Sequence, residues 1–243
     1  MAFPQTLMGK HGWEKVTTTA QKHKLGTRMQ IAEREFVYTS TGEAIVAGNL
    51  VMGKAGTAAH QVDLAVSAQS AGGTTVTLSG SLSIAKDLYK DGWLIFNDVE
   101  EEGHMYRVKG NTLVASATGC VVTLDEEDGL IVAITTSQQV GLYESPYKGT
   151  EKHDGSDIDQ PPLGWTCADI ASGSYGWLCA EGFTTALIEG TPGPGLPLVA
   201  SNSADGSVEI LDSDDDAEGT IVGYMGPIAG VNGEYGLIKA NIG

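Results

Sequence analysis

Few residues of this chain have the types and spacing that catalysis or ligand binding requires. The run from Gly48 to Lys54 has the spacing of a phosphate-binding loop, but Ala55 stands where that motif needs a serine or threonine for magnesium. The interior of the run is apolar, and the sequence predicts no following helix whose N-terminus would face a phosphate. We therefore interpret residues 48–54 as a strand followed by a loop.

Carboxylates gather between Asp212 and Glu218, where four aspartates and one glutamate lie close together in the sequence. Carboxylate oxygens are ligands for calcium. The helix–loop–helix calcium motif needs glycine at its sixth position and glutamate at its twelfth, and this chain has Ala217 and Gly223 there. Acidic runs of this kind are typical of solvated turns. We expect a surface turn, and calcium binding by this cluster remains an alternative.

The remaining reactive side chains form no recognisable constellation. The histidines and cysteines share no spacing typical of a zinc site, and no Gly-x-Ser-x-Gly sequence marks a hydrolase nucleophile. We predict no catalytic residue, no cofactor and no metal site, and hence a protein that is not an enzyme. Cys120, Cys167 and Cys179 are expected to be reduced side chains in the interior.

Strands are the elements that the sequence predicts most clearly. Tyr175, Trp177 and Cys179 alternate with smaller residues, and the same period of two continues through Phe183. Gly182 is expected to break this stretch into two strands. Similar runs, separated by turns about every 8–12 residues, recur along the chain. The sequence therefore predicts an all-β fold, with an extended N-terminal arm and one or two small β-sandwich or barrel domains.

The order along the chain predicts four segments. Residues 1–34 show neither helical nor alternating order and are expected to form the extended arm. Residues 35–148 are expected to form a β domain that opens with a hairpin over residues 35–52. Residues 149–164, which contain Pro161 and Pro162, are expected to be a linker. Residues 165–243 are then a C-terminal β domain.

Charge is distributed unevenly over these segments. The chain carries a formal net charge of −17, although residues 1–35 alone carry +3. An acidic body disfavours nucleic acid, and no apolar run is long enough to span a membrane, so we expect neither partner. A basic arm on an acidic body is expected to bind another protein surface. Its candidate contact residues are the basic and aromatic residues Phe3, Lys10, Trp13, Lys15, Lys22, Lys24 and Arg28.

Several turn and strand sequences point to a family. They are Lys24-Leu25-Gly26-Thr27, Glu35-Phe36-Val37-Tyr38, Ala47-Gly48-Asn49-Leu50-Val51, Asp91-Gly92-Trp93-Leu94, Gly103-His104-Met105-Tyr106-Arg107-Val108, Tyr143-Glu144-Ser145-Pro146-Tyr147 and Tyr175-Gly176-Trp177. Over nearly the whole chain, this pattern resembles the small head-surface proteins of tailed bacteriophages. These motifs are turn and strand signatures and not chemical constellations.

The resemblance implies a capsid decoration (cement) protein. Such a protein binds the outer surface of the major capsid protein shell, often as a homotrimer, and stabilises the shell against the pressure of packaged DNA. It would be made in the cytoplasm of the bacterial host and then be located on the virion. The family has no catalytic residues to carry over to this chain.

Two other structural functions and an enzyme remain as alternatives. One alternative is a receptor- or glycan-binding head fibre, in which exposed Trp and Tyr side chains stack on sugars; here Trp93, Trp165 and Trp177 are expected in the core. A tail or head–tail connector component would form a ring of higher symmetry than a trimer. An enzyme such as a depolymerase would need a convergent acid pair or nucleophile–base pair, which the sequence does not indicate.

Overall fold

The structure, a computed structural model, describes residues 6–80, 82–99, 102–117, 119–154, 160–211 and 220–242. These residues form strands β1 to β19 and two short 3₁₀ helices, so the all-β prediction is confirmed. The chain divides into two compact units. We call residues 1–55 and 146–243 the split unit and residues 56–145 the inserted unit. None of the helices in the described ranges has the length and apolar character needed to cross a membrane.

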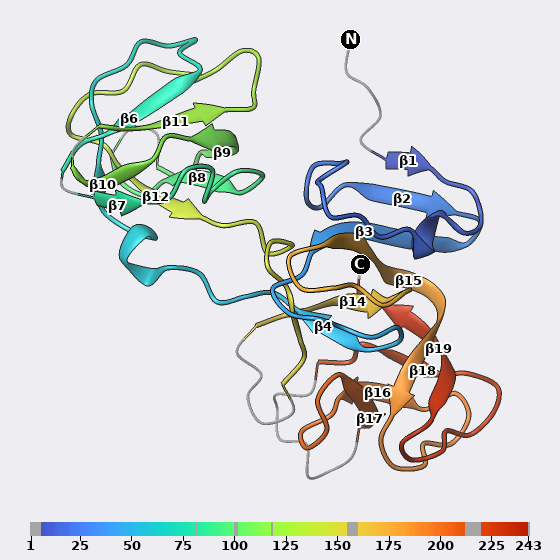
Figure 1. Cartoon of the computed structure of the whole chain (residues 1–243). Helices are drawn as coiled ribbons and strands as arrows, with labels where there is room; N and C mark the ends of the chain where they lie inside the picture. The colour runs from blue at the N-terminus through green and yellow to red at the C-terminus, as the bar shows by residue number, and fades with distance from the viewer. Residues whose placement is uncertain are drawn as a thin grey trace. The chain divides into compact units, whose positions relative to one another are not determined.

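The split unit is built on one large sheet, with β1, β2 and β3 side by side at one edge (Figure 1). β1 pairs in parallel with β2, which forms an antiparallel hairpin with β3. The short strand β4 pairs with β13 and β14. The strands of this unit are β1 (Thr6–Met8), β2 (Arg28–Ile31), β3 (Arg34–Ser40), β4 (Leu50–Met52), β13 (Glu151–Lys152), β14 (Pro162–Thr166), β15 (Tyr175–Ile188), β16 (Pro197–Ala200), β17 (Ser207–Ile210), β18 (Gly223–Met225) and β19 (Tyr235–Asn241).

The fourteen-residue strand β15 holds the split unit together. Its first half pairs with β3 and its second half pairs with β19. β15, β17, β16, β18 and β19 pair in that order, and β19 pairs back to β15, so these five strands form a closed ring. Closure protects the strand edges, which would otherwise expose unpaired backbone groups.

The expected break at Gly182 is wrong, because β15 runs through it. The pairing of β15 with β3 shifts register between Cys179 and Glu181, which marks a bulge. Gly182 follows at a φ of +94°, and a Cβ on it would lie 2.8 Å from the carbonyl oxygen of Glu33. Glycine tolerates both conditions, so the strand passes from the sheet into the ring without ending.

The inserted unit has its own sheet and its own core. Six strands pair in the order β5-β12-β8-β9-β11-β6, and a bridge between Val66 and Leu78 joins the two edges. Fully buried aliphatic and aromatic side chains such as Leu94 and Phe96 fill its interior. Its strands are β5 (Leu64–Ala65), β6 (Thr75–Leu78), β7 (Leu82–Ile84), β8 (Trp93–Phe96), β9 (Met105–Asn111), β10 (Val114–Ala117), β11 (Cys120–Leu124) and β12 (Gln139–Tyr143), and its 3₁₀ helix η2 is Ala58–His60.

The predicted segment boundaries differ from the observed ones. The β domain expected over 35–148 is split, since residues 35–55 belong to the split unit and 56–145 to the inserted unit. The expected linker 149–164 contains β13 and part of β14, both paired with β4, while its residues 155–159 lie outside the described ranges. Residues 165–243 share one sheet with residues 6–40 and are not a separate domain. Strand pairing between distant segments overrides the local composition that suggested these boundaries.

The extended arm is also a wrong prediction for the residues described. Leu25, Met29 and Ile31 are buried in one cluster with Phe36 and Tyr38. Residues 25–31 therefore contribute to the core of the split unit, because their apolar side chains pack with residues of β3 and β15. Residues 1–5 lie outside the described ranges.

Candidate interaction surface at the N-terminal segment

Three of the predicted contact residues lie together in one turn, which we call the basic turn (residues 10–16). The 3₁₀ helix η1 (Trp13–Lys15) forms its centre, and the backbone N–H of Trp13 donates to the carbonyl oxygen of Lys10 at 3.0 Å. Lys10 and Lys15 are exposed, and the indole of Trp13 is 46% exposed. Val16 at 52% and Met8 at 77% add exposed apolar surface nearby in the chain. The turn therefore presents positive charge and apolar area together.

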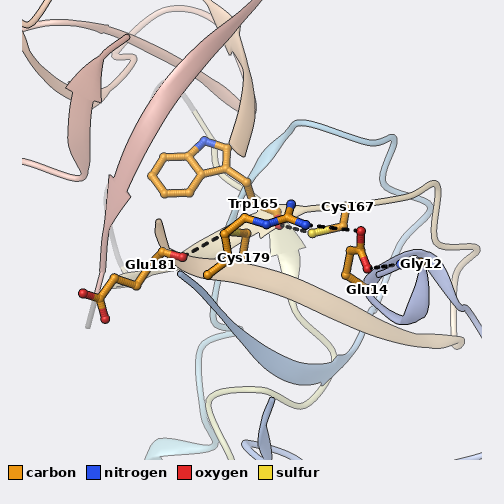
Figure 2. Close-up of polar contacts among 7 residues, drawn as sticks. Gly12, Glu14, Trp165, Cys167, Cys179 and Glu181 are labelled. Atoms are coloured by element: carbon orange, nitrogen blue, oxygen red, sulfur yellow. Dashed lines mark hydrogen bonds and ion pairs between the residues drawn. The ribbon is translucent and has the colours of Figure 1, made fainter. Parts of the chain in front are cut away.

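A buried carboxylate holds the basic turn in place (Figure 2). Glu14 accepts a hydrogen bond from the backbone N–H of Gly12 at 2.7 Å and forms an ion pair with Arg34 at 3.4 Å. Burial alone would raise the pKa of Glu14, but backbone hydrogen bonds and the Arg34 guanidinium outweigh it, so the pKa is lowered. The carboxylate therefore stays charged at neutral pH, and the neighbouring Trp13 and Lys15 on the same turn are exposed.

Two cysteines lie beside this ion pair (Figure 2). The thiols of Cys167 and Cys179 donate to the carbonyl oxygens of Trp165 at 3.8 Å and Glu181 at 3.5 Å. Burial raises the pKa of the Cys179 thiol to about 11 and also raises that of Cys167. A thiol is a nucleophile only as its thiolate, so neither cysteine is activated at neutral pH. All three cysteines are free of disulfides.

Lys22 and Lys24 lie apart from the basic turn, on a loop that packs against an aromatic cluster. The His23 ring between them contacts the rings of Tyr38 at 5.1 Å and Trp177 at 5.4 Å. The backbone N–H of Lys22 donates to the Tyr38 hydroxyl at 3.0 Å. Burial lowers the pKa of His23, which favours the neutral ring. This packing fixes the loop, while both lysine side chains are exposed.

The other predicted contact residues contribute less. Arg28 is exposed on β2 but forms an ion pair with Glu35, which compensates its charge. Phe3 lies outside the described residues. The structure thus brings Lys10, Trp13 and Lys15 into one turn and places Lys22 and Lys24 on another loop.

The described residues contain no group of three His, Cys, Asp or Glu side chains arranged to hold a metal ion. The acidic cluster from Asp212 to Glu218 lies outside these residues. Trp165 and Trp177 are buried as expected, whereas Trp93 is only half-buried. Comparison of the chain with known protein families, curated proteins and solved structures finds no match.

Sequence reasoning missed two features of the split unit. It did not single out Glu14, whose side chain is buried and paired with Arg34. It also did not single out Tyr235 and Leu237, both of which are about half exposed. Gly12, whose φ of +97° permits the turn, was a usable signal for the first feature. No local signal existed for the second feature, because the alternation of apolar and polar residues is the same whether a strand face is covered or exposed.

Proposed function

We propose that this protein is an adhesive structural protein, and specifically a capsid decoration protein that binds the outer surface of a tailed-phage major capsid protein shell. The observation that carries the proposal is the basic turn, in which Lys10, Trp13 and Lys15 are exposed on a chain with a net charge of −17. The resemblance of the turn and strand sequences to phage head-surface proteins supports the same function.

The charge distribution supports an acidic protein partner. Lysines on the surface of an otherwise acidic chain attract carboxylates, and this attraction both speeds encounter and selects orientation. Trp13 supplies an amphipathic ring of the kind that dominates protein interfaces when it enters a pocket on the partner. Lys22 and Lys24 would add a second contact. Such a surface works by adhesion and needs no bond chemistry.

The packing beneath the turn supports tight binding. Because the Glu14–Arg34 ion pair and the Gly12 hydrogen bond already order the turn, little conformational entropy is lost when the turn meets a partner. A shell offers many copies of its binding surface, so a protein that bridges neighbouring subunits also gains from avidity. Both effects favour long-lived binding to the shell over transient binding.

The test is binding of the full chain to expanded, undecorated shells assembled from the major capsid protein encoded with it. We expect co-sedimentation with the shells, and cryo-electron microscopy should show the basic turn against the shell surface. Trp13→Ala combined with Lys10→Glu and Lys15→Glu should weaken binding by about a hundredfold or more, since central interface residues each contribute more than about 1 kcal/mol. Raising the salt concentration should weaken wild-type binding as well.

A matched control uses lysines of the inserted unit. Lys86 and Lys109 are exposed, and Lys86→Glu with Lys109→Glu makes a similar change in net charge. This control should bind shells nearly as well as the wild type. An equal loss of shell affinity in both variants would mean that net charge and not the basic turn governs binding. Wild-type protein that does not bind the shells would refute the proposal. Deletion of residues 1–30 is a poor test, because it would remove buried Leu25 and Met29.

A glycan-binding function has less support. Trp93 is the half-buried tryptophan of the inserted unit, but the Arg107 guanidinium lies 4.4 Å from its ring centroid. This cation–π contact covers one face of the indole, which leaves less of the ring for stacking on a sugar.

A further inference from the structure

The outer face of the five-stranded ring and the loop between β18 and β19 carry a set of large apolar side chains that the described residues leave partly exposed. Six of them are between 39% and 76% exposed, and we call them the apolar ring face: Phe183, Tyr224, Ile228, Val231, Tyr235 and Leu237. The largest apolar patch on a typical monomer is roughly 300–600 Å² and is often functional. Single exposed apolar residues need no explanation, but a set on adjoining strands and the loop that joins two of them does.

The strand register shows that these side chains form one surface. Phe183 on β15 and Tyr224 on β18 both lie opposite Lys239 of β19, so the three make a row across the ring. Leu237 lies two residues along β19 on the same outward face. It also lines a hollow of about 280 Å³ together with Ile228, Val231 and Tyr235. The row and the hollow therefore adjoin at Leu237.

The area suits a protein partner. An aromatic side chain can bury roughly 150–250 Å², and about half of that area remains exposed on the three aromatic residues. With the three aliphatic side chains they supply part of the area of about 800 Å² per partner found in stable interfaces. A net charge of −17 makes two copies of this chain repel each other at long range. The partner must therefore compensate for this repulsion locally.

The charges on this face are arranged for a second copy of the same chain. Lys239 is exposed within the row and has no ion-pair partner among the described residues, and Glu234 is an exposed residue at the edge of the hollow. Residues 234 and 239 lie on either side of Leu237 in the sequence, Glu234 in the turn before β19 and Lys239 within it, which places a candidate two-fold axis near Leu237. A two-fold axis there would bring Lys239 of one copy toward Glu234 of the other, twice per interface. In such an isologous contact the same patch serves both partners.

We propose that the apolar ring face binds a second copy of this chain across a two-fold axis near Leu237. The contact places the Leu237 side chains at the centre, surrounds them with Phe183 and Tyr235, and pairs the two Lys239 ammonium groups with Glu234 carboxylates. This inference does not rest on the proposed capsid contact, which uses the basic turn. Its test also needs no shell, so failure of one proposal leaves the other standing.

The test is the molar mass of the full-length protein by sedimentation equilibrium over a range of concentrations. We expect a dimer in reversible equilibrium with monomer. Leu237→Gln and Phe183→Gln should each raise the dissociation constant about tenfold or more, because central apolar residues dominate interfaces. Both side chains are exposed, so thermal unfolding of each variant should match the wild type at concentrations where both are monomeric. Leu113→Gln, at a 67% exposed position of the inserted unit, is the matched control and should leave the dimer unchanged.

Charge reversal tests the two-fold arrangement itself. Lys239→Glu alone and Glu234→Lys alone should both weaken the dimer, and the double variant should regain much of the lost affinity. A wild-type monomer at all concentrations would overturn the proposal, and so would an assembly that Leu237→Gln leaves intact. A trimer, the state implied by the phage resemblance, would overturn the two-fold contact.

Discussion

The split unit and the inserted unit each bury a histidine, but they satisfy it differently. In the inserted unit the Nδ1 atom of His60 lies 2.5 Å from the hydroxyl oxygen of Tyr89, and the two rings make an edge contact. In the split unit His153 is fully buried, and neither ring nitrogen has a hydrogen-bond partner in the described residues. A buried polar group without a partner costs stability. Both units also bury other polar atoms without a partner among the described residues, Asn97 Oδ1 and Glu126 Oε2 in the inserted unit and Trp165 Nε1 in the split unit. The difference between the units therefore lies in the two histidines.

The two units also differ in how their cores are assembled. The inserted unit has one cluster drawn from a continuous stretch of chain, whereas the split unit has three clusters drawn from both ends of the chain. Separate cores allow separate unfolding. The following predictions are ordered from the largest expected effect to the smallest, and each tests whether the units behave differently.

Removing a buried aromatic side chain should have the largest effect and should act on one unit only. Trp165 in the split unit and Phe96 in the inserted unit are both fully buried. Trp165→Ala and Phe96→Ala should each lower the free energy of unfolding by about 3–5 kcal/mol. Differential scanning calorimetry should show two transitions, with a different one shifted in each variant. If both variants shift both transitions equally, the units unfold together and the comparison fails.

Loss of the buried carboxylate should have an intermediate effect on the split unit. Glu14→Gln leaves the Arg34 guanidinium without its anionic partner and should destabilise the unit by about 2 kcal/mol, as measured by urea unfolding. Glu35→Gln, which breaks the exposed pair with Arg28, is the control and should cost at most about 1 kcal/mol. A larger cost for Glu35→Gln than for Glu14→Gln would contradict the structure.

The same carboxylate predicts a pH dependence. Because the pKa of Glu14 is lower in the folded chain than its ordinary value of 4.5, the charged carboxylate stabilises the folded state at neutral pH. This contribution is complete above the unfolded pKa and is lost as the pH falls through the folded pKa. The stability difference between wild type and Glu14→Gln should therefore shrink in acid, below pH 4.5. A constant difference from pH 7 to pH 3 would show that Glu14 is not charged in the folded state.

The unpartnered histidine should have the smallest effect and should act at a different pH. Burial lowers the pKa of His153 below 6.5, while the charges of Asp154 and Asp205 only partly oppose this shift. Above pH 6.5 the ring is neutral in both states and the effect is absent. As the pH falls below 6.5, the unfolded state binds the proton first, so stability drops by at most about 1.4 kcal/mol per pH unit for one proton.

His153→Leu should remove this component, so its stability should fall less than that of the wild type between pH 7 and pH 5. His60→Leu is the matched variant in the inserted unit. It should lose stability at every pH, because the Tyr89 hydroxyl loses its partner. Equal slopes for wild type and His153→Leu would rule out His153 as a source of acid sensitivity.

The hairpin expected over residues 35–52 does not form, whereas strands close in sequence do pair in the inserted unit. Trp93 lies opposite Arg107 in the antiparallel pair of β8 and β9. In the split unit, β2 and β15 occupy the two edges of β3, so β4 pairs with β13 and β14 instead. Local signals are reliable only where a strand takes its partner from its own neighbourhood.

The residues of the candidate interaction surface were predictable from the sequence, whereas the turn that presents them was not. Composition alone singled out Lys10, Trp13 and Lys15, and the structure leaves all three exposed. Their presentation on an ordered turn depends on Arg34, a residue of β3 that the sequence did not connect with Glu14. A charge in a linear sequence carries no information on the distant residue that will pair with it.

By itself, the sequence determined that the chain folds into short strands, that its interior is aliphatic, and that its first residues are basic. These properties follow from the period of two, from composition and from charge, all of which are local. Only the tertiary structure decided that residues 56–145 form an inserted unit, that β15 joins both ends of the chain, and that Glu14 and His153 are buried while Leu237 is not. Alternation determines which side chains share a face of a strand, but the covering of that face depends on strands distant in sequence.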